Sequence, residues 1–573
     1  MKIRLLLLLS VLMLAACTQK PADESGATFA DVIFVNGAVY TVDAARSWAT
    51  TVAVRGDRIV YVGHDDAQAL RGPDTRIVDL GGRMLMPSFQ DIHIHPITSG
   101  MEFLTVNLYE SSNVAEYVEA VAAYAAANPD AEWLTGAGWT VDAFGPGAKA
   151  DKALLDAVVP DRPVYLESAD GHTAWVNSKA LEIAGVDRDT QDPAGGLIDR
   201  DPDTGEAFGS LQEPAAMDLV GNYIPAPTPE FVAEALKYAV DLLNSYGITA
   251  MTDAKVRPYQ LPAYRALEER GELTVRTTGS LRWDPTRGLE QIEEFKRQRE
   301  EFSLPNFRPT SVKITQDGVM ENYTAVMSEP YFVEGNPTGI PMVDPEFLKE
   351  VVTALDAEGF QVHFHAIGDA AVTQCLDAIE AAIEANGHSR LRHHISHLQA
   401  IRPDDLPRFR ELDIIANFQP KWAYADSYIT ELTLPFIGKE RGNWMYTIRS
   451  VVNAGGMIAF GSDWAVDTAN PFLQLETAVM RHDAEGPVAI DETWMLHETI
   501  DLQTALAAFT INSAYVNGID DVSGSIEVGK LADMIVLDRN LFDIPPAEIS
   551  ETKVLLTLFG GRPVHGSFAL AGE

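Results

Sequence analysis

Eight apolar runs of strand character alternate with amphipathic, helix-like stretches through this chain. Repeated strand–helix alternation is typical of parallel sheets, and eight repeats favour a closed parallel (β/α)8 TIM barrel in the α/β class. A doubly wound open sheet is the alternative, and the polar residues described below argue against it. The expected strands are Leu85–His95, Gly247–Asp253, Leu273–Arg282, Ser311–Gly318, Phe360–Ile367, Arg392–Gln399, Ile414–Lys421 and Met457–Asp463.

A long insertion separates the first two expected strands. It is roughly 150 residues long, so it must hold structure of its own. Strand-like Trp133–Trp139 and Val164–Ser168 lie within it, and a turn-rich stretch covers 192–210. We therefore expect a cap, at about 100–245, over the C-terminal face of a barrel that spans 85–520.

Both ends of the mature chain are rich in strand patterns. Near the N-terminus these are Val32–Val42 and Ala49–Val62, with a hairpin turn at Gly56-Asp57. Ala532–Leu537 and Val554–Phe559 lie near the C-terminus. The economical interpretation is one small sheet domain built from 30–84 and 521–573.

The first 17 residues have the layout of a secretory signal. Lys2 and Arg4 precede an apolar run that is too short to span a bilayer. The sequence Leu14-Ala15-Ala16-Cys17 resembles a bacterial lipobox, which implies acylation of Cys17, export to the periplasm and a membrane anchor. Thr18 in place of Asp favours the outer membrane, and 18–29 is a polar tether. An ordinary cleaved signal with an incidental cysteine is the alternative.

Composition excludes several classes of protein. The chain has 83 acidic and 43 basic residues and a net charge of −40, so a nucleic-acid partner is not expected. Cys17 and Cys375 are the two cysteines, so there is no disulfide framework, and the helical pattern around Cys375 predicts a core position. The oligomeric state stays open, with a homodimer as the commonest case.

Histidine and aspartate fall where expected barrel strands end. His93 and His95 close the first strand with both imidazoles on one side, because side chains alternate along a strand. His365 ends the fifth strand, His397 the sixth and Asp463 the eighth. Strand ends meet at the C-terminal face of a barrel, so these groups should converge there and suit zinc or a similar divalent ion. Histidines buried in the core are the alternative for each one alone.

The order of motifs resembles the metal-dependent amidohydrolase superfamily, in the branch called amidohydrolase family 3 or YtcJ-like. The resemblance covers nearly the whole mature chain and implies a barrel with a flanking β-sandwich made from both termini. It rests on Asp91-Ile92-His93-Ile94-His95, Asp170-Gly171-His172-Thr173-Ala174-Trp175-Val176-Asn177-Ser178, Val312-Lys313-Ile314, Asp317-Gly318, His365-Ala366-Ile367-Gly368-Asp369, His397-Leu398-Gln399, Gly461-Ser462-Asp463 and Gly524-Ser525-Ile526-Glu527-Val528-Gly529-Lys530-Leu531-Ala532-Asp533.

By that resemblance, His93, His95 and Asp463 hold one metal ion, and His365 and His397 hold a second. Lys313 would bridge the two as an N6-carboxylated lysine. The alternative for Lys313 is an ion pair with Asp463 or Asp317, in which case the site holds one metal. The neighbouring His363, His393 and His394 are expected to support the site or to lie in the core.

The expected chemistry follows from the metal. A divalent ion lowers the pKa of bound water from 15.7 toward ~7, and the resulting hydroxide attacks a carbonyl. Asp463 would act as general acid and base, carrying the proton from water to the leaving amine. The resemblance implies that His172 contacts substrate and polarises its carbonyl; the alternative is that it fastens the cap to the barrel. Trp139 and Trp464 are candidate substrate-binding walls or core residues.

These features predict a metal-dependent hydrolase that cleaves a non-peptide C–N bond, an amide or N-acyl bond, in a small molecule. Hydrolysis of an ester, carbamate or cyclic amide is the alternative reaction. A non-catalytic, ligand-binding lipoprotein is the alternative of another class. A serine-nucleophile elbow, a dinucleotide-binding loop and a Walker loop are all absent from the sequence.

Overall fold

The computed structural model describes residues 29–144, 149–193, 196–486 and 495–570. The expected signal segment with Cys17, and all but the last residue of the tether, lie outside these residues. Within the described part of the chain, the helices are all too short or too polar to cross a membrane.

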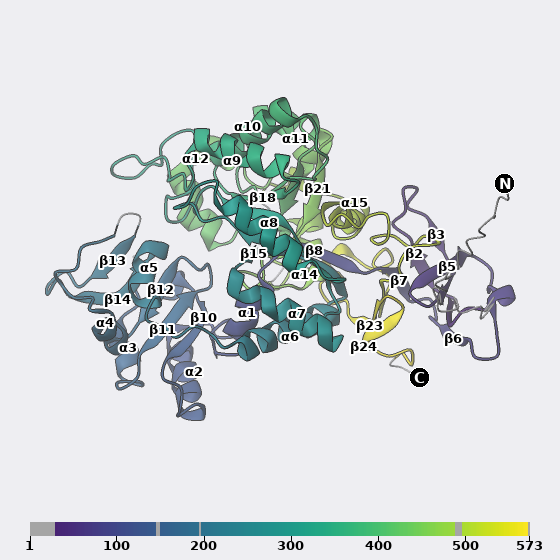
Figure 1. Cartoon of the computed structure of the whole chain (residues 1–573), viewed down its shortest axis with the longest axis horizontal. Coiled ribbons are helices and arrows are strands. Elements are labelled where there is room, and N and C mark those ends of the chain that lie inside the picture. Colours follow the sequence, from purple (N-terminus) through teal and green to yellow (C-terminus); the bar gives the residue numbers. More distant parts are fainter. Residues whose placement is uncertain (1–28, 145–148, 194–195, 487–494, 571–573) are drawn as a thin grey trace, which may run out of the picture.

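Eight parallel strands form the centre of the molecule, which confirms the predicted fold class (Figure 1). Each predicted strand range contains or overlaps one of them. The edge strands β21 and β8 meet at their C-terminal ends, where the backbone N–H of Asp463 donates to the carbonyl of His93 at 2.7 Å. In sheet order the strands are β8 (Phe89–Ile94), β15 (Ile248–Val256), β16 (Arg276–Arg282), β17 (Phe307–Thr315), β18 (Gln361–Ala366), β19 (His394–His397), β20 (Ile415–Phe418) and β21 (Met457–Phe460).

Helices cover the outside of this barrel. The helix α6 (Pro229–Ser245) illustrates why they form: the Thr228 side chain accepts a hydrogen bond from Phe231 N at 3.2 Å, and Pro229 occupies the first turn. Its inward face is apolar and buried. In α10 (Asp369–Asn386) Cys375 is fully buried, as predicted. The other principal helices are α7 (Leu261–Arg270), α8 (Gln291–Phe302), α9 (Pro345–Ala357), α11 (Leu406–Glu411), α13 (Ile448–Asn453) and α14 (Pro471–Met480).

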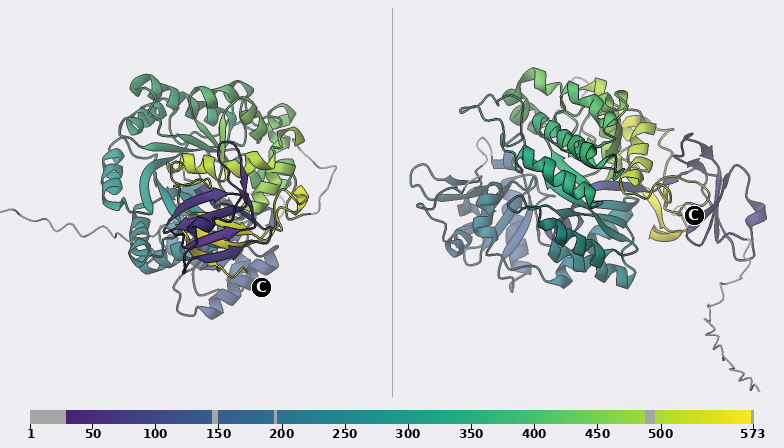
Figure 2. Two further views of the ribbon diagram at one scale, coloured as in Figure 1. Left: turned by 90° about the vertical axis from the view of Figure 1, so that its right-hand side faces the viewer. Right: turned by 45° about the horizontal axis from the view of Figure 1, so that its top comes forward.

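Strands from both chain ends pair at one end of the barrel (Figure 2). In one sheet, β7 (Met84–Pro87) lies between β2 (Ala38–Tyr40) and β22 (Met534–Leu537). The remaining members of this sheet are β3 (Trp48–Ala49), β23 (Val554–Phe559) and β24 (Arg562–Gly566). The second sheet contains β1 (Val32–Val35), β4 (Thr51–Arg55), β5 (Arg58–Gly63) and β6 (Arg76–Asp79). A shared apolar core, including Phe34, Val52 and Leu85, lies between the two sheets.

The first predicted strand, Leu85–His95, is in fact two strands. Its first part belongs to β7 in the chain-end sheet, and the barrel begins only at Phe89 in β8. Between them, Ser88 N donates to the carbonyl of Asp533, so the chain passes directly from one sheet into the other. An unbroken apolar run hides this change of partner, because both strands are buried on both faces.

The insertion forms a separate six-stranded mixed sheet, at the left of Figure 1. Its helices include α2 (Val114–Ala127), α3 (Lys152–Asp156), α4 (Ser178–Ala184) and α5 (Glu213–Gly221). It meets the barrel beside the C-terminal end of β17, where Asn322 Nδ2 donates to Glu213 Oε1 at 3.0 Å. In sheet order its strands are β13 (Leu197–Arg200), β14 (Ala207–Gln212), β12 (Thr173–Val176), β11 (Val164–Ser168), β10 (Leu134–Trp139) and β9 (Val106–Asn107).

Candidate metal centre

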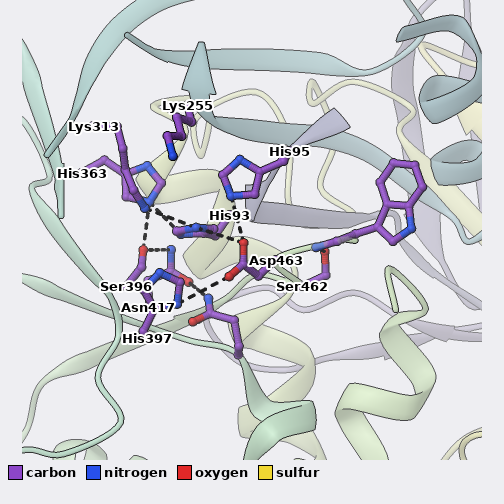
Figure 3. Close-up of polar contacts among 12 residues, drawn as sticks. His93, His95, Lys255, Lys313, His363, Ser396, His397, Asn417, Ser462 and Asp463 are labelled. Carbon is purple, nitrogen blue, oxygen red and sulfur yellow. Dashed lines mark hydrogen bonds and ion pairs between the residues drawn. The ribbon is translucent and has the colours of Figure 1, made fainter. Parts of the chain in front are cut away.

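His93, His95 and Asp463 converge at the C-terminal edge of the barrel (Figure 3). The carboxylate oxygen Oδ1 of Asp463 lies 3.0 Å from Nε2 of His95 and 3.4 Å from Nε2 of His93. One ligand atom from each residue lies within 4.8 Å of the others. Among the described residues, these are the three His, Cys, Asp or Glu side chains that come together in this way.

The ends of β8 and β21 are fastened together beside this cluster. The buried Asp91 carboxylate accepts hydrogen bonds from His93 N at 3.1 Å and from Ser462 N at 3.0 Å. Asp463 follows with φ of 57°, so the backbone leaves the strand direction where its carboxylate turns toward the histidines. His95 precedes α1 (Pro96–Phe103), whose first residue is a proline. Asp91 is thus a positioning residue for two of the three groups.

The donor set fits a divalent metal ion. Within the described structure, His397 Nδ1 is a buried atom without a hydrogen-bond partner, and the buried Asp463 Oδ1 faces the two imidazole nitrogens of His93 and His95. A buried polar atom left without a partner is unfavourable unless something binds it. Burial, and then the Lys313 charge, lower the pKa of His93 to about 3, so its imidazole is neutral at neutral pH. Burial alone would raise the pKa of Asp463, but His93 and its neighbours lower it well below the usual range. Neutral imidazoles and an ionised carboxylate are ligands that suit zinc.

A chain of polar side chains orients His93 from behind. His363 Nε2 lies 2.9 Å from His93 Nδ1, and His363 Nδ1 lies 3.0 Å from Ser280 Oγ. If His93 Nε2 is the ligand atom, Nδ1 carries the proton and donates to His363. The sequence suggested a supporting role for His363, and the structure supplies its partner. Ser280 lies inside a strand, and nothing in the sequence predicted its contact with His363.

The structure places Lys313 beside the cluster. Its Nζ lies 3.2 Å from His93 Nε2, and it forms an ion pair with neither Asp463 nor Asp317 within the described residues. Burial lowers the pKa of Lys313 to about 7, Asp463 opposes the shift and Lys255 adds to it. The alternative in which Lys313 pairs with one of these aspartates is therefore wrong for this structure.

His397 and His365 lie farther round the barrel edge. His397 Nδ1 is 3.7 Å from Asp463 Oδ2, and its ring centroid lies 4.6 Å from that of His93. The His365 ring is 4.3 Å from that of His397, but its Nε2 faces Gly318 O at 3.3 Å and Asp317 Oδ1 at 3.7 Å. The structure therefore brings His397 to the cluster and leaves His365 one ring farther away.

His172 lies at the junction of cap and barrel. Its Nδ1 is 2.9 Å from Glu213 Oε2, the carboxylate that also accepts from Asn322 of the barrel. Burial lowers the pKa of His172, but Glu213 and Asp170 outweigh this and raise it overall. His172 and Glu213 thus connect the cap to the barrel in this structure. Contact between His172 and substrate stays a prediction.

The two candidate tryptophans are both buried. Trp139 is 0% exposed, packs against Trp175 and Phe144, and donates from Nε1 to the carbonyl of Leu166 at 2.9 Å. It is a core residue of the cap, so its assignment as a substrate wall is wrong here. Trp464 is 3% exposed and its ring packs 5.3 Å from that of Phe103. The position of a tryptophan next to a strand-end motif does not predict the direction of its ring.

The chain matches the family described as amidohydrolase family over residues 76–565. Protein LONG AFTER FAR-RED 3 of Arabidopsis thaliana is 31% identical over 96% of this chain and 94% of its own. Putative amidohydrolase YtcJ of Bacillus subtilis is 28% identical over 86% and 91%, and an N-substituted formamide deformylase of Arthrobacter pascens is 26% identical over 93% and 97%.

A solved structure has the same architecture. An uncharacterised metal-dependent hydrolase from Pyrococcus furiosus superposes with a TM-score of 0.69 and 26% identity, covering 89% of this chain and 99% of its own. The family match spans far more than half of the sequence. It includes His93, His95 and Asp463, which together form the metal-type cluster. This chain belongs to the amidohydrolase family and is an enzyme of that family.

Proposed function

We propose that this enzyme hydrolyses an amide or N-acyl bond of a small molecule, with His93, His95 and Asp463 holding a divalent ion such as zinc. The observation that carries the proposal is their convergence: three ligand atoms lie within 4.8 Å of one another, and one of them is a buried carboxylate oxygen. When bound, such an ion would acidify water and polarise a carbonyl.

Asp463 is the residue best placed to move the proton. Its Oδ1 faces His93 and His95, while Oδ2 lies 3.7 Å from His397, so one oxygen can ligate while the other accepts a proton. An amide anion is a very poor leaving group, so the same carboxyl must then protonate the departing nitrogen. His172, at the cap–barrel junction, would orient the carbonyl that is attacked.

A second ion, held by His365 and His397 and bridged by a carboxylated Lys313, is the finer part of this proposal. Lys313 Nζ already lies 3.2 Å from His93 Nε2. Reaction of its amine with CO2 gives an anionic carbamate and releases one proton. Intact-protein mass spectrometry under CO2 should show a mass increase of one CO2 in the wild type and none in Lys313→Ala. No such increase would limit the site to one ion.

The substrate class draws support from one relative, the Arthrobacter pascens protein named as an N-substituted formamide deformylase. Esters, carbamates and cyclic amides would meet the same residues and stay the second candidate class. The family membership argues against a non-catalytic binding protein.

We also propose export and acylation at Cys17, with the outer membrane as the destination; the sequence of residues 1–17 supports this. Loss of membrane association in Cys17→Ser, with wild-type activity retained in the soluble fraction, would support the anchor. Equal membrane association of both proteins would contradict it.

The test of function is a panel of N-formyl, N-acyl, cyclic-amide and ester compounds, assayed with metal-depleted and zinc-reconstituted enzyme. We expect metal-dependent release of amine from at least one N-acyl compound. Asp463→Asn should abolish that release, and His388→Gln, at an exposed position before β19, is the control. Hydrolysis of esters alone would favour the second class, and no metal-dependent turnover of any compound would overturn the proposal.

A further inference from the structure

Three cationic side chains gather at the C-terminal ends of β15 and β16, beside the metal-type cluster. Lys255 is the second-last residue of β15, Arg257 follows that strand, and Arg282 ends β16. Val256 pairs with Leu281, so Arg257 and Arg282 are the next residues on neighbouring strands. Arg282 in turn pairs with Lys313 on β17. The register therefore places all three cations along one sector of the barrel mouth.

A local irregularity directs Lys255 toward the cluster. The register of β15 against β16 shifts between Asp253 and Val256. Asp253 is held by the hydroxyl of Tyr264 on α7, at 2.6 Å, and accepts from Lys255 N at 3.2 Å. On a regular strand Lys255 would face the same side as Asp253, and such shifts re-aim side chains. Figure 3 shows the Lys255 side chain reaching toward the cluster, between Lys313 and His95.

These cations lack a partner of opposite charge. Acidic residues outnumber basic ones 83 to 43 in this chain, yet in the described structure neither Lys255, Arg257 nor Arg282 forms an ion pair with a carboxylate. Burial, and then the charges of Arg257 and Arg282, lower the pKa of Lys255 to about 8. Glu167 on β11 of the cap lies near enough for Lys255 and Arg257 to lower its pKa, although burial raises it overall. Asp284, two residues farther along the chain, and Asp218 on α5 also act on Arg282 without forming an ion pair with it.

Lys255 and Arg257 are half-buried and Arg282 is exposed at the barrel mouth. Like charges brought this close repel one another, and a bound anion relieves that repulsion. Two guanidinium groups match a carboxylate in geometry, since each can donate two parallel hydrogen bonds. We propose that Lys255, Arg257 and Arg282 bind a carboxylate of the substrate and so place its amide over His93, His95 and Asp463. The substrate class is then an N-acyl amino acid or a similar amido acid, and this inference rests on the proposed function.

The test compares matched pairs of compounds that differ in one charge: N-formyl and N-acetyl amino acids of both configurations, each against its carboxamide. The zinc-loaded wild type should cleave the preferred acid with a kcat/KM at least about 10-fold above that of its carboxamide, the range that one charged hydrogen bond gives. Arg282→Gln and Lys255→Met should lose most of this preference through KM for the acid, with little change for the carboxamide. Arg287→Gln is the matched control, because Arg287 follows the same strand but pairs with Glu294 at 3.3 Å.

The outcomes separate this inference from the proposed function. Equal cleavage of acids and carboxamides, or a preference that survives in both variants, would overturn the carboxylate site and leave the amidase activity intact. If no compound is turned over, calorimetric titration of the same pairs decides. If the acids bind more tightly than the carboxamides, and Arg282→Gln abolishes that difference, the carboxylate site is supported even without the proposed activity. If the wild type binds both compounds equally, or binds neither, the carboxylate site is refuted. If Lys255→Met alone lowers activity, and lowers it equally for both compounds, then Lys255 acts on Lys313 and the cluster and does not bind the carboxylate.

Discussion

Closure of the barrel between β21 and β8 depends on the absence of a side chain at Gly461. A Cβ added there would lie 2.5 Å from the backbone N of His93 and 2.6 Å from its Cβ. Carbon atoms in contact need about 3.5 Å, so Gly461→Ala must push the two strands apart by roughly 1 Å. Asp463 lies two residues farther on and donates its N–H to His93 O at 2.7 Å, so the displacement falls directly on two of the three groups of the cluster.

The expected cost has two parts. Overpacking of a close contact typically destabilises by ~1–3 kcal/mol. Metal ligands tolerate distance errors of only about 0.2 Å, so zinc affinity should fall by more than the ~10-fold to 100-fold that loss of an orienting partner causes. Gly461 is not in the left-handed region, so alanine adds bulk there without backbone strain.

Zinc content by elemental analysis, competitive zinc titration and urea unfolding of the apoprotein measure the two parts separately. Gly221→Ala is the control, because the nearest atom to a Cβ at that helical glycine would be Tyr165 Oη at 3.6 Å, an ordinary contact. It should be neutral or slightly stabilising. Unchanged zinc affinity in Gly461→Ala would refute the claim that this strand contact sets the ligand geometry.

Three further predictions follow from contacts at other places. His363→Gln should weaken zinc binding by ~10-fold to 100-fold, because it removes the partner of His93 Nδ1; His393→Gln, whose partner is Asp356, should leave zinc affinity unchanged, and equal effects would contradict the assignment. Trp139→Phe should lower the free energy of unfolding by ~1–3 kcal/mol without changing KM, since it removes a buried hydrogen bond to Leu166; a raised KM at unchanged stability would restore its substrate role. Burial, and then the charge of Glu167, raise the pKa of Glu102 to about 8, so folding takes up a proton there and wild-type stability falls as pH rises from about 4.5 to 8. Glu102→Gln cannot ionise, and its stability relative to wild type in denaturant titrations should therefore be greater at pH 8 than at pH 5; no difference between the two pH values would contradict the buried, protonated state.

Much of the barrel and part of the site could be read from the sequence, because both depend on local periodicity. Alternating apolar runs gave the eight strands, and the two-residue repeat placed His93 and His95 on one side of β8. Parallel strands end at one face, so Asp463, about 370 positions later, could be expected beside them. The match between Cys375 and a buried helix position has the same origin.

Features that depend on which surfaces meet could not be predicted. Strand β7 belongs to the chain-end sheet and not to the barrel, because it pairs with β22 from the far end of the chain. Trp139 turned out to be part of the cap core, and His365 faces the loop after β17 rather than the cluster, because packing sets the direction of a ring. Lys255 reaches the site through a shift in register that no periodicity encodes. Periodicity in the sequence thus determined the strands and placed the candidate metal ligands at their C-terminal ends. Only tertiary contacts decided which of these side chains point toward one another, because side-chain direction depends on neighbours that are distant in sequence.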